Sequence, residues 1–188
     1  MHFENHMTIS HRRNVELKAR VNSLGAAKEI CREFAQFSVT ERQTDTYFCC
    51  SHGRLKLRER EGLPAQLVGY ARADSTDPRP SDYWLVPVVE AGQLKAALVA
   101  TLGVLVVVEK VRDVFLYQNV RIHLDRVTEL GEFVEFEAVL APADDEREAA
   151  EVVSQLAARL RIESAQRVDG SYSDLLLSVK AARAAAGS

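Results

Sequence analysis

The sequence predicts an α+β fold, in which a mostly antiparallel sheet carries helices on its outside. Many segments alternate charged and apolar residues, which is the period of a strand whose two faces meet different surroundings. Consecutive strand-like segments are joined mainly by short turns, which connect antiparallel strands but not parallel ones. Three or four further segments have apolar residues at helical spacing and can cover the apolar face of the sheet.

The chain of 188 residues is long enough for one domain of ordinary size with its own core. Its composition is near the average of globular proteins, and its formal net charge is -3. We find no internal repeat and no interdomain linker, so we expect a single domain over residues 14–180. We expect residues 1–13 to be a disordered arm and the alanine-rich residues 181–188 to be a frayed tail.

The first half of the chain contains most of the expected strands. Ser23 is a suitable N-cap, and Ala27, Ile30 and Phe34 follow it at helical spacing, which predicts a helix up to Phe37. Two prolines and several turn formers predict a loop over residues 74–81. The expected strands of this half cover residues 15–21, 39–43, 46–50, 54–60, 66–73 and 82–88.

The second half combines further strands with the remaining helices. The apolar run 104–108 opens a strand that we expect to be buried, and the pair Gln118-Asn119 predicts a hairpin turn. Acidic residues from 144 to 148 suit the positive end of a helix dipole, so a helix should start there. The expected helices cover residues 91–102, 144–160 and 172–180, and the expected strands cover 104–116, 120–124 and 133–140.

Charge is segregated by sign among these strands. Four basic side chains share one face of a single strand, namely Arg54, Lys56, Arg58 and Arg60. Glu135 and Glu137 share one face of another strand. Solvated sheet faces usually mix both signs, because like charges on neighbouring strands repel each other. The segregation therefore indicates a site for a highly charged anion together with its metal ions.

If the strands close into a barrel with their charged faces inward, cations and carboxylates line one shared interior. The residues expected inside are Glu16, Lys18, Arg20, Arg54, Lys56, Arg58, Arg60, Tyr70, Arg72, Lys110, Arg112, Arg121, His123, Asp125, Glu135 and Glu137. Solvation explains any single charged face equally well, so this hypothesis depends on the segregation across several strands. Because crowded cations repel one another, Lys56→Ala or Arg58→Ala should weaken anion binding while the fold survives or gains stability.

The charged segments also match the motifs of a known family. Residues 14–18, Asn-Val-Glu-Leu-Lys, resemble the ExExK signature of the CYTH superfamily, the triphosphate tunnel enzymes. The resemblance continues in order through residues 45–48, 53–59, 70–72, 80–83, 109–112, 123–127, 130–137 and 171–176. A single ExExK signature would be a weak signal, but this ordered series covers residues 14–177, which is nearly the whole chain.

The resemblance implies a closed antiparallel barrel of eight strands, the triphosphate tunnel, flanked by helices. It also implies a triphosphate-containing small molecule as substrate and Mg²⁺ or Mn²⁺ as cofactor. Known activities of the family include class IV adenylyl cyclase, which converts ATP to cyclic AMP and pyrophosphate. Others hydrolyse thiamine triphosphate or inorganic triphosphate. The chain most resembles the cyclase-like group, and the choice between cyclisation and hydrolysis stays open.

Motif positions assign roles to individual residues through this resemblance. The expected phosphate ligands are Lys18, Lys56, Arg58, Arg72, Lys110 and Arg112. The expected metal ligands are Glu16, Glu135 and Glu137, with Asn14 and Asp125 as further candidates. The expected catalytic residues are Lys18, Arg58 and Asp125, the last also as a residue that positions water.

Asn14 departs from the signature, which has its first glutamate at this position. An amide offers one oxygen to a metal ion but brings no charge, so a second metal site should be weaker or be completed by the substrate. This departure keeps open a different class of function, a non-catalytic module that binds triphosphate or polyphosphate.

Other classes of partner are disfavoured. The net negative charge and the few aromatic residues among the basic ones argue against nucleic acid. No apolar segment has the length of a signal peptide or a membrane span, and the three cysteines fit neither a zinc motif nor a disulfide framework. We therefore expect a cytoplasmic protein that does not bind membranes. Residues 104–108 and the apolar exterior of the barrel could serve a homodimer or belong to the core.

Overall fold

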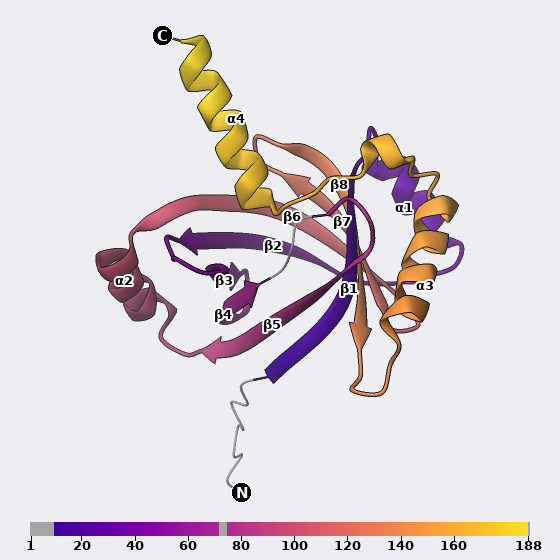
Figure 1. Cartoon of the computed structure of the whole chain (residues 1–188), viewed down its shortest axis with the longest axis horizontal. Coiled ribbons are helices and arrows are strands. Elements are labelled where there is room, and N and C mark those ends of the chain that lie inside the picture. The colour runs from indigo at the N-terminus through magenta and orange to yellow at the C-terminus, as the bar shows by residue number, and fades with distance from the viewer. Residues whose placement is uncertain (1–9, 72–74, 188) are drawn as a thin grey trace, which may run out of the picture.

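The computed structural model describes residues 10–71 and 75–187, and their centre is a closed barrel of eight strands (Figure 1). The strands follow the order β1-β5-β4-β3-β2-β6-β7-β8 around the barrel, and every neighbouring pair is antiparallel. The strands are β1 (Ser10–Arg20), β2 (Gln36–Phe48), β3 (Arg54–Arg60), β4 (Leu63–Ala71), β5 (Arg79–Val88), β6 (Val104–Tyr117), β7 (Val120–Val127) and β8 (Gly131–Leu140). The expected α+β fold with a closed eight-stranded antiparallel barrel is thus confirmed.

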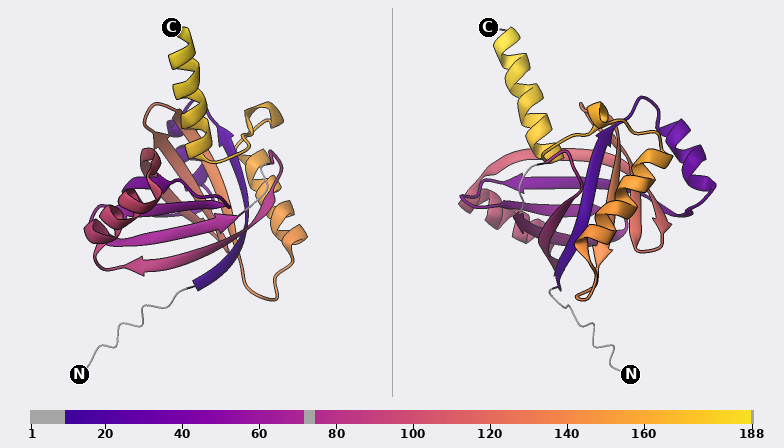
Figure 2. Two further views of the ribbon diagram at one scale, coloured as in Figure 1. Left: turned by 60° about the vertical axis from the view of Figure 1, so that its left-hand side comes forward. Right: turned by 45° about the vertical axis from the view of Figure 1, so that its right-hand side comes forward.

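Helices flank the barrel on several sides. The α-helices of the described residues are α1 (Leu24–Arg32), α2 (Ala91–Leu102), α3 (Glu146–Arg159) and α4 (Tyr172–Ala186). α1 and α3 lie on one outer wall, and α2 lies at the opposite side of the molecule (Figure 1). α4 starts at one end of the barrel and projects away from it (Figure 2). None of the described helices is long and apolar enough to cross a membrane.

Alternation along the strands separates the hydrophobic core from the barrel interior. On β1, Val15 and Leu17 face outward and belong to a core cluster with α1 and α3, whereas Glu16 and Lys18 face inward. The cluster continues over the outer faces of β7 and β8 and includes the buried Val153 of α3. Burying one such side chain contributes ~1.5–3 kcal/mol. The outer packing therefore supports the barrel, and its interior can hold polar groups.

The first turns of α4 close one end of the barrel. Tyr172 and Leu176 are buried against Val106, Val108 and Phe133, which lie on β6 and β8. A capping box at the start of the helix satisfies its first backbone amides and holds this turn in place. The polar part of the interior is therefore bounded by apolar side chains at this end.

The beginning of β1 corrects the expected arm. β1 starts at Ser10 because residues 10–16 pair with β5, so residues 10–13 are strand and not a disordered arm. Residues 1–9 lie outside the described part of the chain. β5 likewise starts at Arg79, inside the expected loop 74–81, through the same pairing.

The expected helix up to Phe37 is also too long. α1 ends at Arg32, and Phe37 belongs to β2, where it is paired with Phe115 of β6. Pairing along the whole of β6 outweighs the local helical spacing, and it also joins the two short strands expected at 39–43 and 46–50 into one.

Two further expectations are wrong, one about the burial of residues 104–108 and one about the conformation of residues 181–188. The run 104–108 is not a buried strand, because Val107 is 39 % exposed and Leu105 is 43 % exposed on its outward face. Alternation thus continues through this run, and its role in a homodimer remains a prediction. The tail 181–188 does not fray from residue 181, because α4 continues to Ala186 with alanines, the best helix formers.

Candidate functional site

A cavity of about 390 Å³ lies in the barrel interior and receives side chains from all eight strands. Its volume is within the usual range of small-molecule sites, ~300–1,000 Å³. Among the described residues, eight lysine and arginine side chains line it, against four glutamates. A concave surface with this excess of positive charge focuses the electrostatic potential and attracts anions.

Most residues expected in the interior do line the cavity. They are Glu16, Lys18, Lys56, Arg58, Arg60, Tyr70, Lys110, Arg112, Arg121, His123, Glu135 and Glu137, and the candidate metal ligand Asn14 lines it as well. Arg20 and Arg54 do not line it, because Arg20 lies over the ring of Phe133 and Arg54 forms an ion pair with Asp174 of α4 at 2.8 Å. Both arginines lie at the end of the barrel that α4 closes. Arg72 is outside the described residues, so its role stays a prediction.

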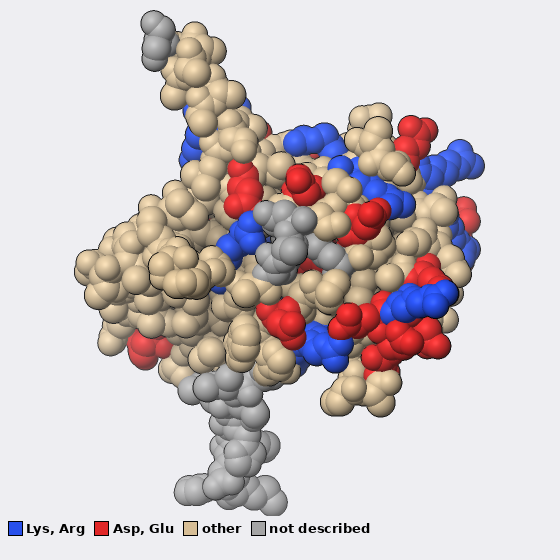
Figure 3. Space-filling view, viewed as in Figure 1, with Lys and Arg blue, Asp and Glu red and all other residues tan. Residues whose placement is uncertain are grey.

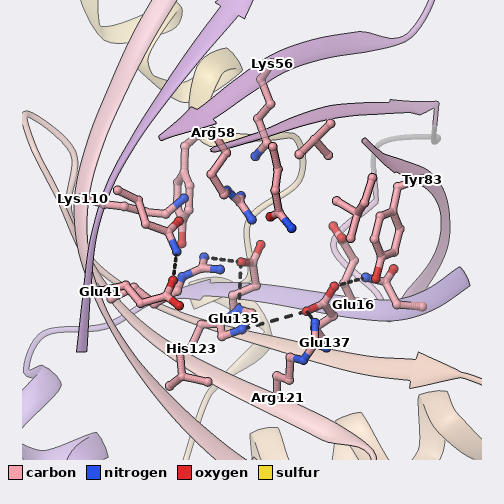
Figure 4. Close-up of a pocket in the computed structure, with 18 of the residues that line it drawn as sticks. Glu16, Glu41, Lys56, Arg58, Tyr83, Lys110, Arg121, His123, Glu135 and Glu137 are labelled. Carbon is pink, nitrogen blue, oxygen red and sulfur yellow. Dashed lines mark hydrogen bonds and ion pairs between the residues drawn. The ribbon is translucent and has the colours of Figure 1, made fainter. Parts of the chain in front are cut away.

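Cations from β3 and β6 converge in the cavity, where Lys56, Arg58 and Lys110 point toward one another (Figure 4). Asp45 of β2 lies behind them and is 1 % exposed. Lys56 Nζ and Lys110 Nζ donate to Asp45 Oδ2 at 2.9 and 3.2 Å, and Arg58 Nε donates to Asp45 Oδ1 at 2.9 Å. A single buried carboxylate therefore supplies the counter-charge for three cations.

The two lysines of this group have lowered pKa values. Burial and the nearby Arg58 lower the pKa of Lys56 to about 8, although Asp45 acts in the opposite direction. Burial, Arg112 and Arg58 lower the pKa of Lys110 to about 7, again against Asp45. Near neutral pH the charge of Lys110 is therefore sensitive to any anion that binds beside it.

Carboxylates gather across the interior, on β1 and β8. Lys18 Nζ lies 3.1 Å from Glu135 Oε1, and Arg112 Nη2 donates to Glu135 Oε2 at 2.7 Å. Although burial alone would raise it, these two cations hold the pKa of Glu135 well below its usual range. Glu137 accepts a hydrogen bond from Asn14 Nδ2 at 2.7 Å. Cations and hydrogen-bond donors thus already engage Glu135 and Glu137, the two glutamates of β8 that line the cavity.

The donor set of Glu16, Glu137 and Asn14 fits a divalent cation. Glu16 and Glu137 are direct cross-strand neighbours, so their charges repel, and Arg121 Nη1, 3.3 Å from Glu137 Oε2, offsets part of this repulsion (Figure 4). Asn14 Oδ1 is buried and has no hydrogen-bond partner in the described structure. No group of three or more His, Cys, Asp or Glu among residues 10–71 and 75–187 forms a complete metal site. Mg²⁺ commonly takes one or two protein carboxylates and completes its shell with phosphates and water, and two carboxylates with one amide oxygen match that chemistry.

Asp125, expected as a catalytic residue and a further metal ligand, does not line the cavity. Its side chain is fully buried, and Arg112 donates to both of its oxygens at 2.6 and 2.5 Å. The hydroxyl of Tyr172 also donates to Asp125 Oδ2, at 2.7 Å. Because these partners engage both oxygens, the carboxylate orients Arg112 and Tyr172 and does not face a substrate.

The sequence reasoning gave no role to Asp45, Glu41, Tyr83 or Tyr172. Glu41, Tyr83 and Tyr172 line the cavity, and Asp45 lies behind its cations. Alternation would have placed Glu41 and Asp45 on one inward face if residues 36–48 had been taken as a single strand. The packing of Tyr172 on Lys18, whose Nζ lies 4.2 Å from the ring centroid, has no local sequence signal because it joins distant segments.

Comparisons with known proteins agree with this geometry. The family model described as CYTH domain matches residues 12–172. A protein from Pyrococcus horikoshii superposes with a TM-score of 0.75 at 23 % identity, covering 86 % of this chain and 98 % of that one. A candidate adenylate cyclase from Vibrio parahaemolyticus gives 0.67 at 20 % identity, covering 87 % and 97 %. A candidate adenylyl cyclase from Hippeastrum, named for a dominant triphosphatase activity, gives 0.58 at 13 % identity, covering 80 % and 88 %.

At these identities the structural likenesses show a shared fold alone. No curated protein matches the chain. The family match carries more weight, because it runs from β1 through β8 to the start of α4 and so includes the whole site. The chain therefore belongs to the CYTH domain family.

Proposed function

We propose that this chain is a metal-dependent enzyme that acts on a triphosphate-containing small molecule bound in the barrel interior. The observation that carries this proposal is the convergence of lysine and arginine side chains on one cavity inside the barrel, across from a group of carboxylates. A linear triphosphate carries several negative charges, and charge-assisted hydrogen bonds from surrounding strands match its shape. The family match supports the proposal, and so do the names of the Vibrio and Hippeastrum proteins.

Each cation has a distinct place in this proposal. Lys56 and Arg58 of β3, with Lys110 and Arg112 of β6, would bind phosphate oxygens. Lys18 would reach the same phosphates from the side of the carboxylates, where it now pairs with Glu135. Charge that develops on phosphate oxygens during transfer is stabilised by such fixed cations, so Lys18 and Arg58 are the proposed catalytic groups.

Glu16 and Glu137, with Asn14 Oδ1 beside them, are the proposed ligands of Mg²⁺ or Mn²⁺. When bound, the ion would neutralise phosphate charge and help to align the reacting groups. Glu135 is a less accessible ligand, because it would have to release its contacts with Lys18 and Arg112.

Cyclisation and hydrolysis differ in the nucleophile that the site must place. A cyclase aligns the ribose 3'-hydroxyl with the α-phosphorus, whereas a triphosphatase aligns water with the γ-phosphorus. The purified chain should be incubated with ATP, thiamine triphosphate and tripolyphosphate, each with Mg²⁺ or Mn²⁺. Cyclic AMP with pyrophosphate would identify a cyclase, and release of phosphate would identify a triphosphatase. Failure to convert any of the three would overturn the proposal of an enzyme.

Asn14 favours a second candidate, a module that binds triphosphate without turnover. Its amide donates to Glu137 where the family signature has a third carboxylate, so the metal site has less negative charge. Calorimetry that shows tight binding of tripolyphosphate without product would support this candidate. Asn14→Glu should then gain turnover, whereas an enzyme that is already active needs no such change.

The exterior gives little support to nucleic-acid binding. On the face shown in Figure 3, lysine and arginine side chains are interspersed with aspartate and glutamate and form no continuous basic stripe. The basic residues that converge are instead inside a cavity of about 390 Å³, which suits a small triphosphate and excludes a duplex.

A further inference from the structure

Asp45 is placed where it can act on the phosphate ligands but not on a substrate. It is almost fully buried and is absent from the cavity lining. Its two oxygens accept four hydrogen bonds from three cations, with Arg58 Nη2 adding a second bond at 3.2 Å to those from Arg58 Nε, Lys56 and Lys110. A buried carboxylate engaged by three cations on both of its oxygens, and absent from the cavity lining, is poorly placed to bind a metal ion or a substrate donor.

Without this carboxylate, the surroundings of the two lysines would be strongly unfavourable to charge. Lys56 of β3 and Lys110 of β6 come from the two strands that flank β2, the strand of Asp45, and both are buried. The other charged or titratable groups that face them are Arg112 of β6, Glu135 of β8, Tyr47 of β2, Tyr70 of β4 and Tyr172 of α4. Asp45 is the acidic group that touches both ammonium groups. Burial already lowers both pKa values despite its presence.

The second buried carboxylate of the site provides an internal comparison. Asp125 holds Arg112 through two hydrogen bonds, as Asp45 holds Arg58. A guanidinium stays charged under all ordinary conditions, so Asp125 can only orient its partner. A buried lysine loses its proton readily, so a carboxylate beside it decides its charge as well as its direction.

We propose that Asp45 is a positioning residue that keeps Lys56 and Lys110 charged, and Arg58 aligned, for binding a polyphosphate anion. This inference rests on the proposed function, because those three side chains are its phosphate ligands. The wild-type cavity binds the anion over a wider pH range than a cavity without this carboxylate.

The test is the pH dependence of tripolyphosphate binding by Asp45→Asn, measured by calorimetry without metal so that no turnover occurs. At about pH 5 both lysines are protonated in the wild type and are protonated to the greatest extent in the variant, so the two proteins should differ least in binding there. At about pH 7 the lysines of the wild type keep at least half of their charge, whereas those of the variant should be largely neutral, since loss of a contacting opposite charge lowers a lysine pKa by about 1–3 units. For each protein, the dissociation constant at the higher pH is divided by the dissociation constant at the lower pH. This ratio should be at least about tenfold larger in the variant than in the wild type. Weaker binding by an equal factor at both pH values would show a merely structural role and would overturn the proposal.

Asp113→Asn is the matched control. Asp113 is a carboxylate of β6 that pairs with Lys28 at 2.6 Å and is absent from the cavity lining. This variant has the same change in net charge and should keep the wild-type ratio. Asp45→Glu keeps the negative charge and should restore most of the binding at the higher pH.

A second measurement separates this inference from the proposed function. NMR titration of carbon-13-labelled lysine side chains reports the pKa of Lys56 and Lys110 without any ligand, and both should fall in Asp45→Asn. If Asp45→Asn does not fold, the measurement uses the double variant Asp45→Asn, Lys110→Met, which removes one negative and one positive charge together. The pKa of Lys56 should then be lower than in Lys110→Met alone. Unchanged lysine pKa values would overturn the role of Asp45, whereas a wild type that binds no tripolyphosphate would overturn only the proposed function.

Discussion

Arg58 shows how one side chain serves both the fold and the ligand. Replacing it with alanine removes a phosphate ligand. The KM for the triphosphate should rise at least about tenfold, because one charge-assisted hydrogen bond contributes about 1.5–3 kcal/mol to binding. The change also takes two hydrogen bonds from Asp45, so the fold should lose about 1–3 kcal/mol of stability. Steady-state kinetics and urea unfolding measure the two effects.

If repulsion between the crowded cations were the only effect, Arg58→Ala would stabilise the fold. The difference arises because the sequence shows which charges share a face but not the buried carboxylate that they share. Arg42→Ala is a suitable control, since Arg42 forms an exposed pair with Glu61 at 3.7 Å. If Arg58→Ala behaves like Arg42→Ala in both measurements, Arg58 does not belong to the site.

Glu137 tests the proposed metal site at the scale of one residue. Glu137→Gln keeps the shape of the side chain but removes a charge next to Glu16, so the Mn²⁺ concentration for half-maximal activity should rise at least about tenfold. Excess Mn²⁺ should restore part of the activity. Metal titrations of the initial rate make this measurement.

Glu41→Gln provides the control within the same cavity. Glu41 lies on β2 and pairs with Arg60 at 3.6 Å, away from the proposed metal ligands. Its replacement should leave the half-maximal Mn²⁺ concentration unchanged, whatever it does to the KM. Equal metal dependence of the two variants would exclude a special role of Glu137.

At the scale of elements, the two halves of α4 should differ in their contribution to stability. Leu176→Ala leaves a cavity where the helix closes the barrel and should cost about 2–4 kcal/mol. Deletion of residues 181–188 removes only exposed side chains among those described and should change the melting temperature little. Thermal unfolding of both variants checks this, and a large loss on deletion would mean that the distal half packs against a partner.

Elements that alternate strictly were predictable, and elements whose limits depend on distant pairing were not. The strand 54–60 has the expected bounds because basic residues alternate with leucines from Arg54 to Arg58, and only Glu59 departs from the pattern. The end of α1 was misplaced because Phe34 and Phe37 satisfy a helical period, whereas Phe37 pairs with Phe115, far away in the sequence. The split of β2 had the larger consequence, since it concealed the inward position of Asp45.

At the scale of the whole molecule, the two buried lysines make stability depend on pH. Their pKa values of about 8 and about 7 in the fold compare with 10.5 for the unfolded chain. Between these limits the unfolded chain binds more protons, so the free energy of unfolding rises with pH, by up to about 1 kcal/mol per pH unit for each lysine. The rise should run from about pH 7 to about pH 9, where the Cys31 thiol begins to ionise in the unfolded chain and acts in the opposite direction.

Urea unfolding at about pH 7, pH 8 and pH 9 measures this trend. Lys110→Met should flatten it, because one of the two titrating groups is removed. A wild-type stability that stays constant or falls across this range would show that the lysines titrate normally in the fold.

The closed barrel and its polar interior follow from the sequence more fully than the details of the site. Alternation alone placed most of the charged residues on inward faces, and the cavity lining agrees. Alternation predicts whether a side chain points into or out of the barrel, but not how far along the barrel it lies or which partner engages it. It therefore could not separate Arg54 and Asp125 from the residues that line the cavity. The bounds of the cavity are set by α4, which lies far from these strands in the sequence.

The most direct test of the central claim is a crystal structure of the chain with a non-hydrolysable triphosphate analogue and Mn²⁺, with the metal located by anomalous scattering. The account predicts phosphates in contact with Lys56, Arg58 and Lys110, and Mn²⁺ beside Glu16 and Glu137. Analogue bound only on the outer surface, or a barrel interior that holds water and no anion at saturating analogue, would contradict it.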